Sequence, residues 1–78
     1  MIEKLGLSIK AVFSDFDKTK LREEMLLGEI EHWDSMNSVN LLIELESSFR
    51  VSLSGVVLTA DDSLSDIMSM LKEKGAKA

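Results

Sequence analysis

The side chains best suited to chemistry gather in one short stretch that ends at Ser35. His32, Asp34 and Ser35 supply an imidazole, a carboxylate and a hydroxyl, the three groups of a hydrolase triad, within four positions. A triad needs the imidazole between the acid and the nucleophile, with one ring nitrogen facing each, and neighbours in one loop rarely achieve that arrangement. The Gly-x-Ser-x-Gly turn that exposes a nucleophilic serine is also missing around Ser35. The pattern therefore argues against an enzyme, and no residue is predicted to be catalytic.

The same stretch is rich in residue types that bind metals. Glu29, Glu31, His32 and Asp34 lie close in sequence, but their spacing matches neither a calcium loop nor a zinc motif. The chain contains no cysteine, which excludes disulfides, a thiolate metal site and a cysteine nucleophile. We therefore predict a solvated acidic loop and no metal site here, and any thiol chemistry must come from an attached cofactor.

A long amphipathic helix is predicted from residue 35 to residue 49. Apolar residues recur in it at spacings of three and four, which predicts one broad buried face formed by Met36, Val39, Leu41, Leu42, Ile43, Leu45 and Phe49. The Asp34 carboxylate suits the helix start, because it can accept from free N–H groups of the first turn and favours the positive end of the helix dipole. Ser35 then lies on the solvent side, where those N–H groups favour a phosphate. Ser35 is therefore a candidate attachment point for a phosphate-linked group.

The residues around Ser35 also resemble a known family. Asp34-Ser35-Met36, followed by Val39, Leu41-Leu42, Leu45-Glu46 and Phe49, is similar to the Asp-Ser-Leu segment of acyl and peptidyl carrier proteins. The similarity covers residues 27 to 71. Leu27, Ile30 and Trp33 resemble the loop of members with a Trp-Asp-Ser motif, and Ser63 to Leu71 resembles the last helix of the family. The resemblance implies a stand-alone, specialised acyl carrier protein with three to four helices.

A cofactor on Ser35 is what this resemblance implies. In the family, a phosphopantetheinyl transferase attaches 4'-phosphopantetheine to the serine, and the thiol of the arm holds an acyl group as a thioester. Asp34 and Met36 flank the site, and Asp34 is expected to help the transferase engage. The candidates for the surface that meets partner enzymes are Trp33, Met36, Val39 and Glu46. For Trp33 the role of a loop anchor, placed by its large apolar area, is favoured over contact with a partner enzyme or the arm. The expected partners are the transferase and the acyl-loading and acyl-transfer enzymes of fatty-acid, polyketide or other specialised biosynthesis.

Two other functions remain open. An aminoacyl or peptidyl carrier, of a nonribosomal-peptide-type or D-alanine-transfer pathway, would use the same arm with different cargo. A cofactor-free helical interaction domain would leave Ser35 as an ordinary helix-cap serine. The helix after Ser35 is also less acidic than in many fatty-acid carriers, with only Glu44 and Glu46. Because acidic residues there steer basic enzymes, this predicts a different partner set from general fatty-acid synthesis.

Size and charge bound the class of protein. A chain of 78 residues allows one small domain, residues 1–78, and the absence of proline together with 45% hydrophobic residues favours a helical bundle. A net charge of -5 argues against nucleic-acid binding and favours a basic protein partner. The start of the chain lacks the apolar core of a signal peptide, and the longest uncharged stretch, residues 51–60, is too short to cross a bilayer. We expect a cytoplasmic monomer without membrane insertion.

The remaining elements follow from apolar spacing and from breaks in it. A first helix is predicted over residues 2–14, in which Gly6 costs about 1 kcal/mol relative to alanine. A long loop follows to residue 33, with short turns near residues 21–26. Residues 50–53 are predicted to be an extended connector, residues 56–61 an optional short helix, and residues 64–74 a last helix that begins with a capping box of Ser63 and Asp66. Residues 75–78 are expected to fray.

The predicted fold is therefore all-α, a small bundle of three to four helices with a long first loop. Its predicted core consists of Leu5, Ile9, Val12, Leu27, Val39, Leu42, Ile43, Phe49, Val51, Leu64, Ile67, Met68 and Leu71.

Overall fold

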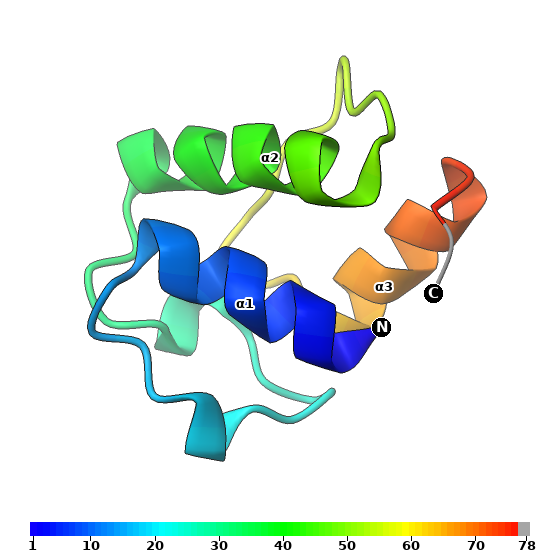
Figure 1. The fold of residues 1–78 in the computed structure, drawn as a ribbon. Helices are drawn as coiled ribbons and strands as arrows, with labels where there is room; N and C mark the ends of the chain where they lie inside the picture. Colours follow the sequence, from blue (N-terminus) through cyan, green and yellow to red (C-terminus); the bar gives the residue numbers. More distant parts are fainter. Residues whose placement is uncertain (77–78) are drawn as a thin grey trace.

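The computed structural model describes residues 1–76 and contains three α-helices, α1 (Ile2–Val12), α2 (Ser35–Phe49) and α3 (Leu64–Glu73). Two short 3₁₀ helices, η1 (Lys18–Lys20) and η2 (Leu27–Glu29), interrupt the long segment between α1 and α2. In Figure 1, α1 and α2 lie side by side, and α3 lies beside the N-terminal end of α1. No strand occurs within residues 1–76, so the predicted small all-α fold with a long first loop is confirmed.

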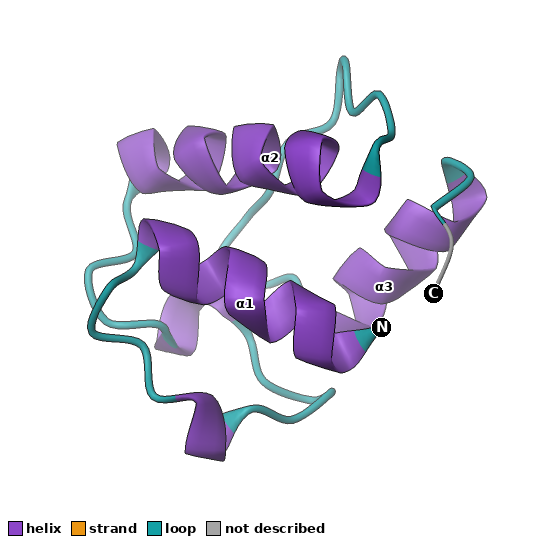
Figure 2. Cartoon of the chain, in the orientation of Figure 1, coloured by secondary structure: helices purple, strands orange, loops and turns teal. Residues whose placement is uncertain are grey.

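The helix boundaries follow the predictions closely, with one exception. α2 has its predicted bounds, α1 ends two residues early and α3 ends one residue early. α1 stops because Phe13 leaves helical geometry, with φ -111 and ψ 86, although its N–H still donates to the Ile9 carbonyl at 2.7 Å. The optional helix near residues 56–61 does not form, and Figure 2 shows this part of the chain as a loop. A turn at Glu23 and Glu24 falls where short turns were predicted.

The core lies where the three helices and the first loop meet. The predicted core residues that are buried are Leu5, Ile9, Leu27, Phe49, Leu64, Ile67, Met68 and Leu71. Val12, Leu42 and Val51 are only half-buried and pack against the edge of the core. The first loop is held to the core by further buried residues, Phe16, Met25 and Ile30.

The buried face of α2 corrects the sequence-based prediction. Leu41, Leu45 and Phe49, which are spaced by four residues, are at most 5% exposed and lie on the side of α2 that packs in the core. Three residues predicted to be buried are instead exposed: Met36 at 73%, Val39 at 54% and Ile43 at 58%. The prediction was wrong because α2 carries apolar residues on two sides, so spacing alone does not select a face. The core covers one side only, and the side with Leu41, Leu45 and Phe49, flanked by the half-buried Leu42, offers more apolar surface to bury.

Backbone hydrogen bonds join the first loop to the segment that leads into α3. The N–H of Leu27 donates to the Asp62 carbonyl at 2.8 Å, and the N–H of Gly28 donates to the Ala60 carbonyl at 2.9 Å. Two bonds of 2.9 Å run the other way, from the start of α3 to the first loop. A Cβ at position 28 would lie 2.8 Å from the Ala60 Cβ, so glycine is what allows the two segments to approach.

Both ends of α3 are capped. Ser63 and Asp66 form the predicted capping box, with backbone-to-side-chain bonds of 3.0 and 3.1 Å. At the other end Gly75 has φ 98, and the N–H of Ala76 donates to the Leu71 carbonyl at 2.9 Å, which closes the helix in the Schellman manner. Residues 75 and 76, part of the tail that was expected to fray, thus close the helix, and residues 77 and 78 lie outside the described residues.

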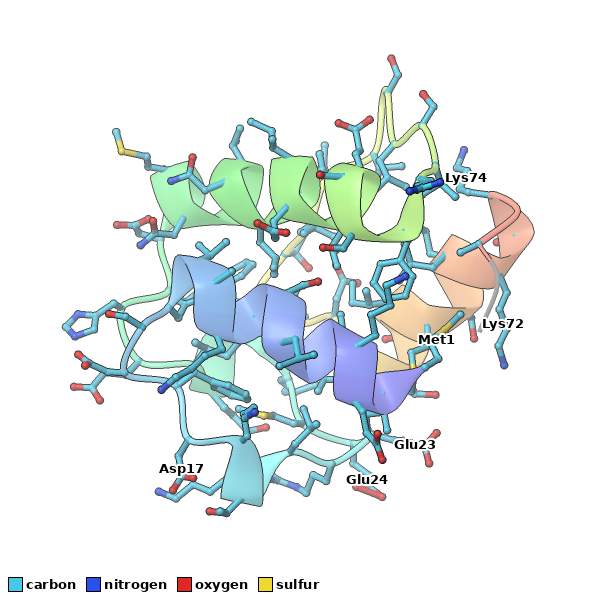
Figure 3. All side chains as sticks on the ribbon, in the orientation of Figure 1. Met1, Asp17, Glu23, Glu24, Lys72 and Lys74 are labelled. Atoms are coloured by element: carbon cyan, nitrogen blue, oxygen red, sulfur yellow. The ribbon has the colours of Figure 1, made fainter. Side chains whose placement is uncertain are left out.

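Charged side chains project from much of the surface. In Figure 3, Glu23 and Glu24 lie near the N-terminal end of α1, and Lys72 and Lys74 extend from the end of α3. All four are exposed. Of the helices in residues 1–76, none combines the length and the apolar character needed to cross a membrane.

Candidate functional site

The site predicted from the sequence lies at the N-terminal end of α2. Ser35 is the first residue of the helix and is exposed. Asp34 is the N-cap residue: its backbone is extended, with φ -153 and ψ 178, and its Oδ1 accepts from the N–H of Asn37 at 2.7 Å. The predicted cap is therefore present, and a cap of this kind stabilises a helix by about 1 kcal/mol.

The side chains of Asn37 and Ser38, and not that of Ser35, make further hydrogen bonds at the start of α2. The Ser38 hydroxyl donates to the Ser35 carbonyl at 2.7 Å, and the Asn37 side-chain amide donates to the His32 carbonyl at 3.2 Å. His32 has φ 71, in the left-handed region, where the chain turns toward α2. Because Asp34, Asn37 and Ser38 hold this end of the helix, the Ser35 hydroxyl is not needed for capping.

Trp33 fixes the chain just before the cap. Its ring stacks on the buried ring of Phe13, with centroids 5.9 Å apart and planes inclined by 21°. Its backbone N–H donates to the carbonyl of Ile30, another buried residue, at 3.1 Å. Trp33 is half-buried, which supports the interpretation that it anchors the loop. The stack joins the end of α1 to the start of α2. No local sequence pattern predicts this contact, because the two residues are far apart in the sequence.

His32 lies among acidic groups and not against Ser35. Its Nε2 is 3.7 Å from a carboxylate oxygen of Glu31 and 4.0 Å from one of Asp15, and all three side chains are largely exposed. Within residues 1–76 no hydrogen bond joins the imidazole to Asp34 or Ser35, and the Asp34 carboxylate bonds to the N–H of Asn37 instead. The three groups of the hydrolase hypothesis are thus not hydrogen-bonded to one another.

The acidic residues upstream have partners within the loop. The Glu29 carboxylate accepts from the Leu26 N–H at 2.8 Å and from the Arg22 guanidinium at 2.9 Å. The Leu26 N–H, followed by the Arg22 side chain, holds the pKa of Glu29 below its ordinary value. In the described part of the chain, no three His, Asp or Glu side chains form a group that could hold a metal ion. Glu29 thus secures the turn at η2.

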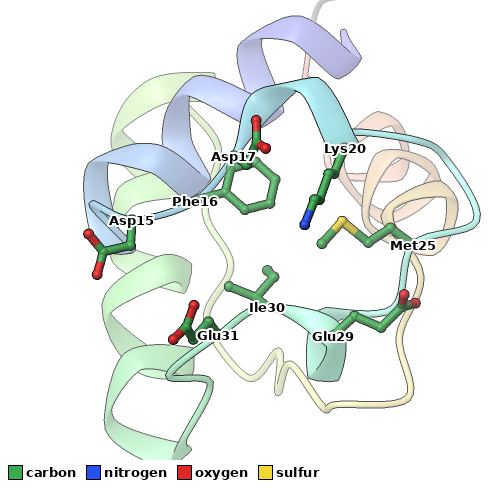
Figure 4. Close-up of a pocket in the computed structure, with 8 residues that line it drawn as sticks. All are labelled: Asp15, Phe16, Asp17, Lys20, Met25, Glu29, Ile30 and Glu31. Carbon is green, nitrogen blue, oxygen red and sulfur yellow. The ribbon is translucent and has the colours of Figure 1, made fainter.

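A pocket of about 150 Å³ opens beside this loop (Figure 4). It is lined by Asp15, Phe16, Asp17, Lys20, Met25, Glu29, Ile30 and Glu31. In Figure 4 the amino group of Lys20 points toward the middle of the pocket. The acidic side chains that line the pocket therefore have a positive charge of the same chain among them. The Asp17 carboxylate accepts from the Thr19 hydroxyl at 2.6 Å and from the Thr19 N–H at 2.9 Å, and these bonds lower the pKa of Asp17. None of the lining residues belongs to the motif at residues 33–36, so the pocket is separate from the Ser35 site.

The residues predicted to meet partner enzymes occupy different positions on α2. Met36 and Val39 are exposed on its outer face, together with Ile43. Glu46 is half-buried, and its Oε2 accepts from the N–H of Leu53 at 2.7 Å. Glu46 therefore holds the connector after α2 against the helix. The sequence gives no signal for this bond, because it depends on how the chain turns after residue 50.

Comparisons with known proteins yield no relative: no protein-family model matches the chain, and neither a curated protein nor a solved structure matches it. What the chain does must therefore be inferred from the residues and the geometry around Ser35.

Proposed function

We propose that this protein is an acyl carrier in which Ser35 bears a 4'-phosphopantetheine arm, and that its bundle is of the acyl-carrier type. The observation that carries the proposal is the position of Ser35. It is exposed at the first residue of α2 and follows a carboxylate that caps the helix. The Asp34-Ser35-Met36 sequence, which resembles the attachment motif of carrier proteins, coincides with this helix start.

The surroundings of Ser35 suit a phosphate-linked group. The first N–H groups of an α-helix have no partner within the helix, and the dipole makes this end positive. A phosphodiester on the Ser35 hydroxyl would place its negative charge at this end, where it is favoured. The Phe13–Trp33 stack and the Asp34 cap hold the helix start in place. The attached group would therefore leave the protein at a fixed point on its surface.

The proposed role of this chain is to present a group and not to catalyse a reaction. A separate phosphopantetheinyl transferase would join phosphopantetheine from coenzyme A to the Ser35 oxygen as a phosphodiester. When attached, the arm supplies a terminal thiol that can hold an acyl group as a thioester. Met36, exposed next to Ser35, would contact the enzymes that load and transfer the acyl group.

The test is an intact mass measurement after incubation with coenzyme A, magnesium and a broad-specificity phosphopantetheinyl transferase. Three proteins are compared: the wild type, Ser35→Ala and Ser38→Ala. Ser38 is the matched control, because it lies one turn later and also takes part in the helix start. The wild type and Ser38→Ala should each gain one phosphopantetheine, and Ser35→Ala should gain none. A folded wild type without any mass gain would overturn the proposal.

A second candidate function, a cofactor-free interaction domain, is favoured by one observation. Met36, Val39 and Ile43 expose apolar surface on one side of α2, and such patches mark interaction sites when they are contiguous. This candidate predicts no mass gain and partner binding that Ser35→Ala leaves intact. Loading assays with acyl-activating and aminoacyl-activating enzymes would then separate an acyl carrier from an aminoacyl or peptidyl carrier, if the arm is attached.

A further inference from the structure

A pocket with two cations in its wall lies at the end of the bundle where α2 and α3 finish. Figure 1 shows the start of α1, the end of α2 and the end of α3 on this side of the molecule. The pocket has a volume of about 300 Å³. The residues that line it are Lys4, Ser48, Phe49, Arg50 and Gly75. Ser35 lies at the opposite end of α2, so the pocket is separate from the proposed attachment site.

The two cations of the pocket have no carboxylate partner in the described part of the chain. Within residues 1–76 the ion pairs are those of Arg22 and His32, and neither Lys4 nor Arg50 takes part in one. The Lys4 ammonium lies 5.0 Å from the centre of the Phe49 ring, a contact that holds the charge at the pocket wall. Two positive charges thus face one cavity in a chain whose net charge is -5.

One acidic side chain reaches the edge of the pocket. The Glu44 carboxylate accepts from the hydroxyl of Ser48, a lining residue, at 2.7 Å. Glu3 and Glu73 belong to the other two helices but are not among the lining residues. Lys74, the residue after α3, is exposed, and Figure 3 shows it beside the end of α2. Cations therefore outnumber carboxylates around the cavity.

Both cations occupy positions that helix stability alone would not select. Arg50 has φ 54 at the residue that ends α2, where glycine is usual because it takes a left-handed backbone without strain. Lys4 lies in the first turn of α1, where the helix dipole disfavours a positive charge. The dipole at the end of α2 favours a cation nearby, but it does not require the left-handed residue itself to be one. A ligand therefore explains the two positions better than helix stability does.

We propose that this pocket binds a small phosphorylated molecule, with the phosphate held between Arg50 and Lys4. The guanidinium of Arg50 can donate two parallel hydrogen bonds to phosphate oxygens, and a phosphate monoester carries a charge of about -1.5 to -2 at neutral pH. Small-molecule sites have volumes of roughly 300–1,000 Å³, so the pocket has room for a small organic group beside the phosphate. The net negative charge of the chain disfavours an anionic membrane as the source of the phosphate. This inference does not depend on an arm at Ser35.

The test follows the backbone amide chemical shifts of the isotope-labelled protein at neutral pH and constant ionic strength. The probes are inorganic phosphate, phenyl phosphate and acetate. Phosphate should shift the amides of Ser48, Arg50 and Gly75 and saturate in the millimolar range. Phenyl phosphate should bind about threefold more tightly, because its ring adds apolar contact with the Phe49 side of the pocket. Acetate should give no saturable shift, because it has half the charge or less.

Arg50→Gly separates binding from folding. Glycine fits the left-handed backbone, so Tm should rise by about 4 °C while the affinity for phosphate falls about tenfold or more. Lys4→Gln should weaken binding about threefold and keep α1 intact, since glutamine and lysine have similar helix propensities. Lys18→Gln is the matched control, because Lys18 is exposed in η1. Figure 3 labels its neighbour Asp17 on the opposite side of the molecule from Lys74, and this variant should bind phosphate as the wild type does.

The same titrations contain the results that would overturn the pocket. These are phosphate binding that Arg50→Gly leaves unchanged, acetate that binds as tightly as phosphate, or phenyl phosphate that binds more weakly than phosphate. Vesicles containing phosphatidic acid test the membrane source: binding to vesicles without a saturable shift by soluble phosphate would assign the cations to a lipid surface and overturn the proposal. A wild type that binds phosphate in this pocket but is never modified at Ser35 would overturn the carrier function and leave the pocket standing.

Discussion

Alanine substitutions at Leu45 and Ile43 should affect stability very differently, because only one side of α2 is buried. Leu45 is 0% exposed, whereas Ile43 is 58% exposed. Truncating a fully buried leucine to alanine costs about 2–5 kcal/mol. Fully burying an isoleucine contributes about 1.5–3 kcal/mol, so the loss at Ile43, which is less than half buried, should be about 1 kcal/mol or less. The higher helix propensity of alanine reduces that loss further.

The difference is large compared with the stability of the whole chain. At about 0.05–0.15 kcal/mol per residue, a domain of 78 residues has a free energy of unfolding of about 4–12 kcal/mol. For a domain of this size, 1 kcal/mol changes Tm by about 4–8 °C. Leu45→Ala should therefore lower Tm by about 15 °C, and Ile43→Ala by about 5 °C or less.

Thermal unfolding followed by far-ultraviolet circular dichroism measures both effects in one experiment. The helix content of each variant at low temperature serves as the control that it is folded. Equal losses of Tm, or a larger loss for Ile43→Ala, would mean that α2 buries the side carrying Met36, Val39 and Ile43 and would contradict the exposure of these side chains.

Three smaller perturbations test the contacts of the first loop and of the start of α2. Gly28→Ala should destabilise the fold by about 1–3 kcal/mol, because its Cβ would lie 2.8 Å from that of Ala60; an unchanged urea midpoint would contradict that close approach. Asp34→Ala should cost about 1 kcal/mol, since it leaves the Asn37 N–H without its cap, and Asp34→Asn should recover most of the loss in the same denaturation assay. The lowered pKa of Glu29 means that its carboxylate contributes stability above about pH 4.5 and that this contribution disappears as the pH falls through the lower folded pKa. The difference in urea midpoint between the wild type and Glu29→Gln should therefore shrink below pH 4.5, and a difference that stays constant with pH would refute the assigned cause.

The parts of the fold that could be predicted depend on local signals. Asp34 before an apolar run predicts where α2 begins, and Ser63 with Asp66 predicts where α3 begins; both caps are present. These signals act over three residues, within one turn of chain, so they do not depend on the rest of the fold.

The parts that could not be predicted depend on which surfaces meet. The face that α2 buries is decided by what packs against it, and its apolar spacing fits either side. The contacts at the end of α3 could not be predicted for a similar reason. The Ala76 N–H reaches the Leu71 carbonyl only because the chain makes a left-handed turn at Gly75. At the site, the exposure of Ser35 followed from the cap, but the stack of Phe13 on Trp33 joins distant positions through the folded loop.

The central claim is tested most directly by locating the modification within the chain. After incubation with coenzyme A and the transferase, cleavage next to Lys and Arg releases residues 23–50 as one peptide, which contains the serines at positions 35, 38, 47 and 48. Tandem mass spectrometry of this peptide should place one phosphopantetheine on Ser35 and leave Ser38, Ser47 and Ser48 unmodified. A modification on another serine, or an unmodified peptide from folded protein, would contradict the assignment of Ser35 as the attachment site.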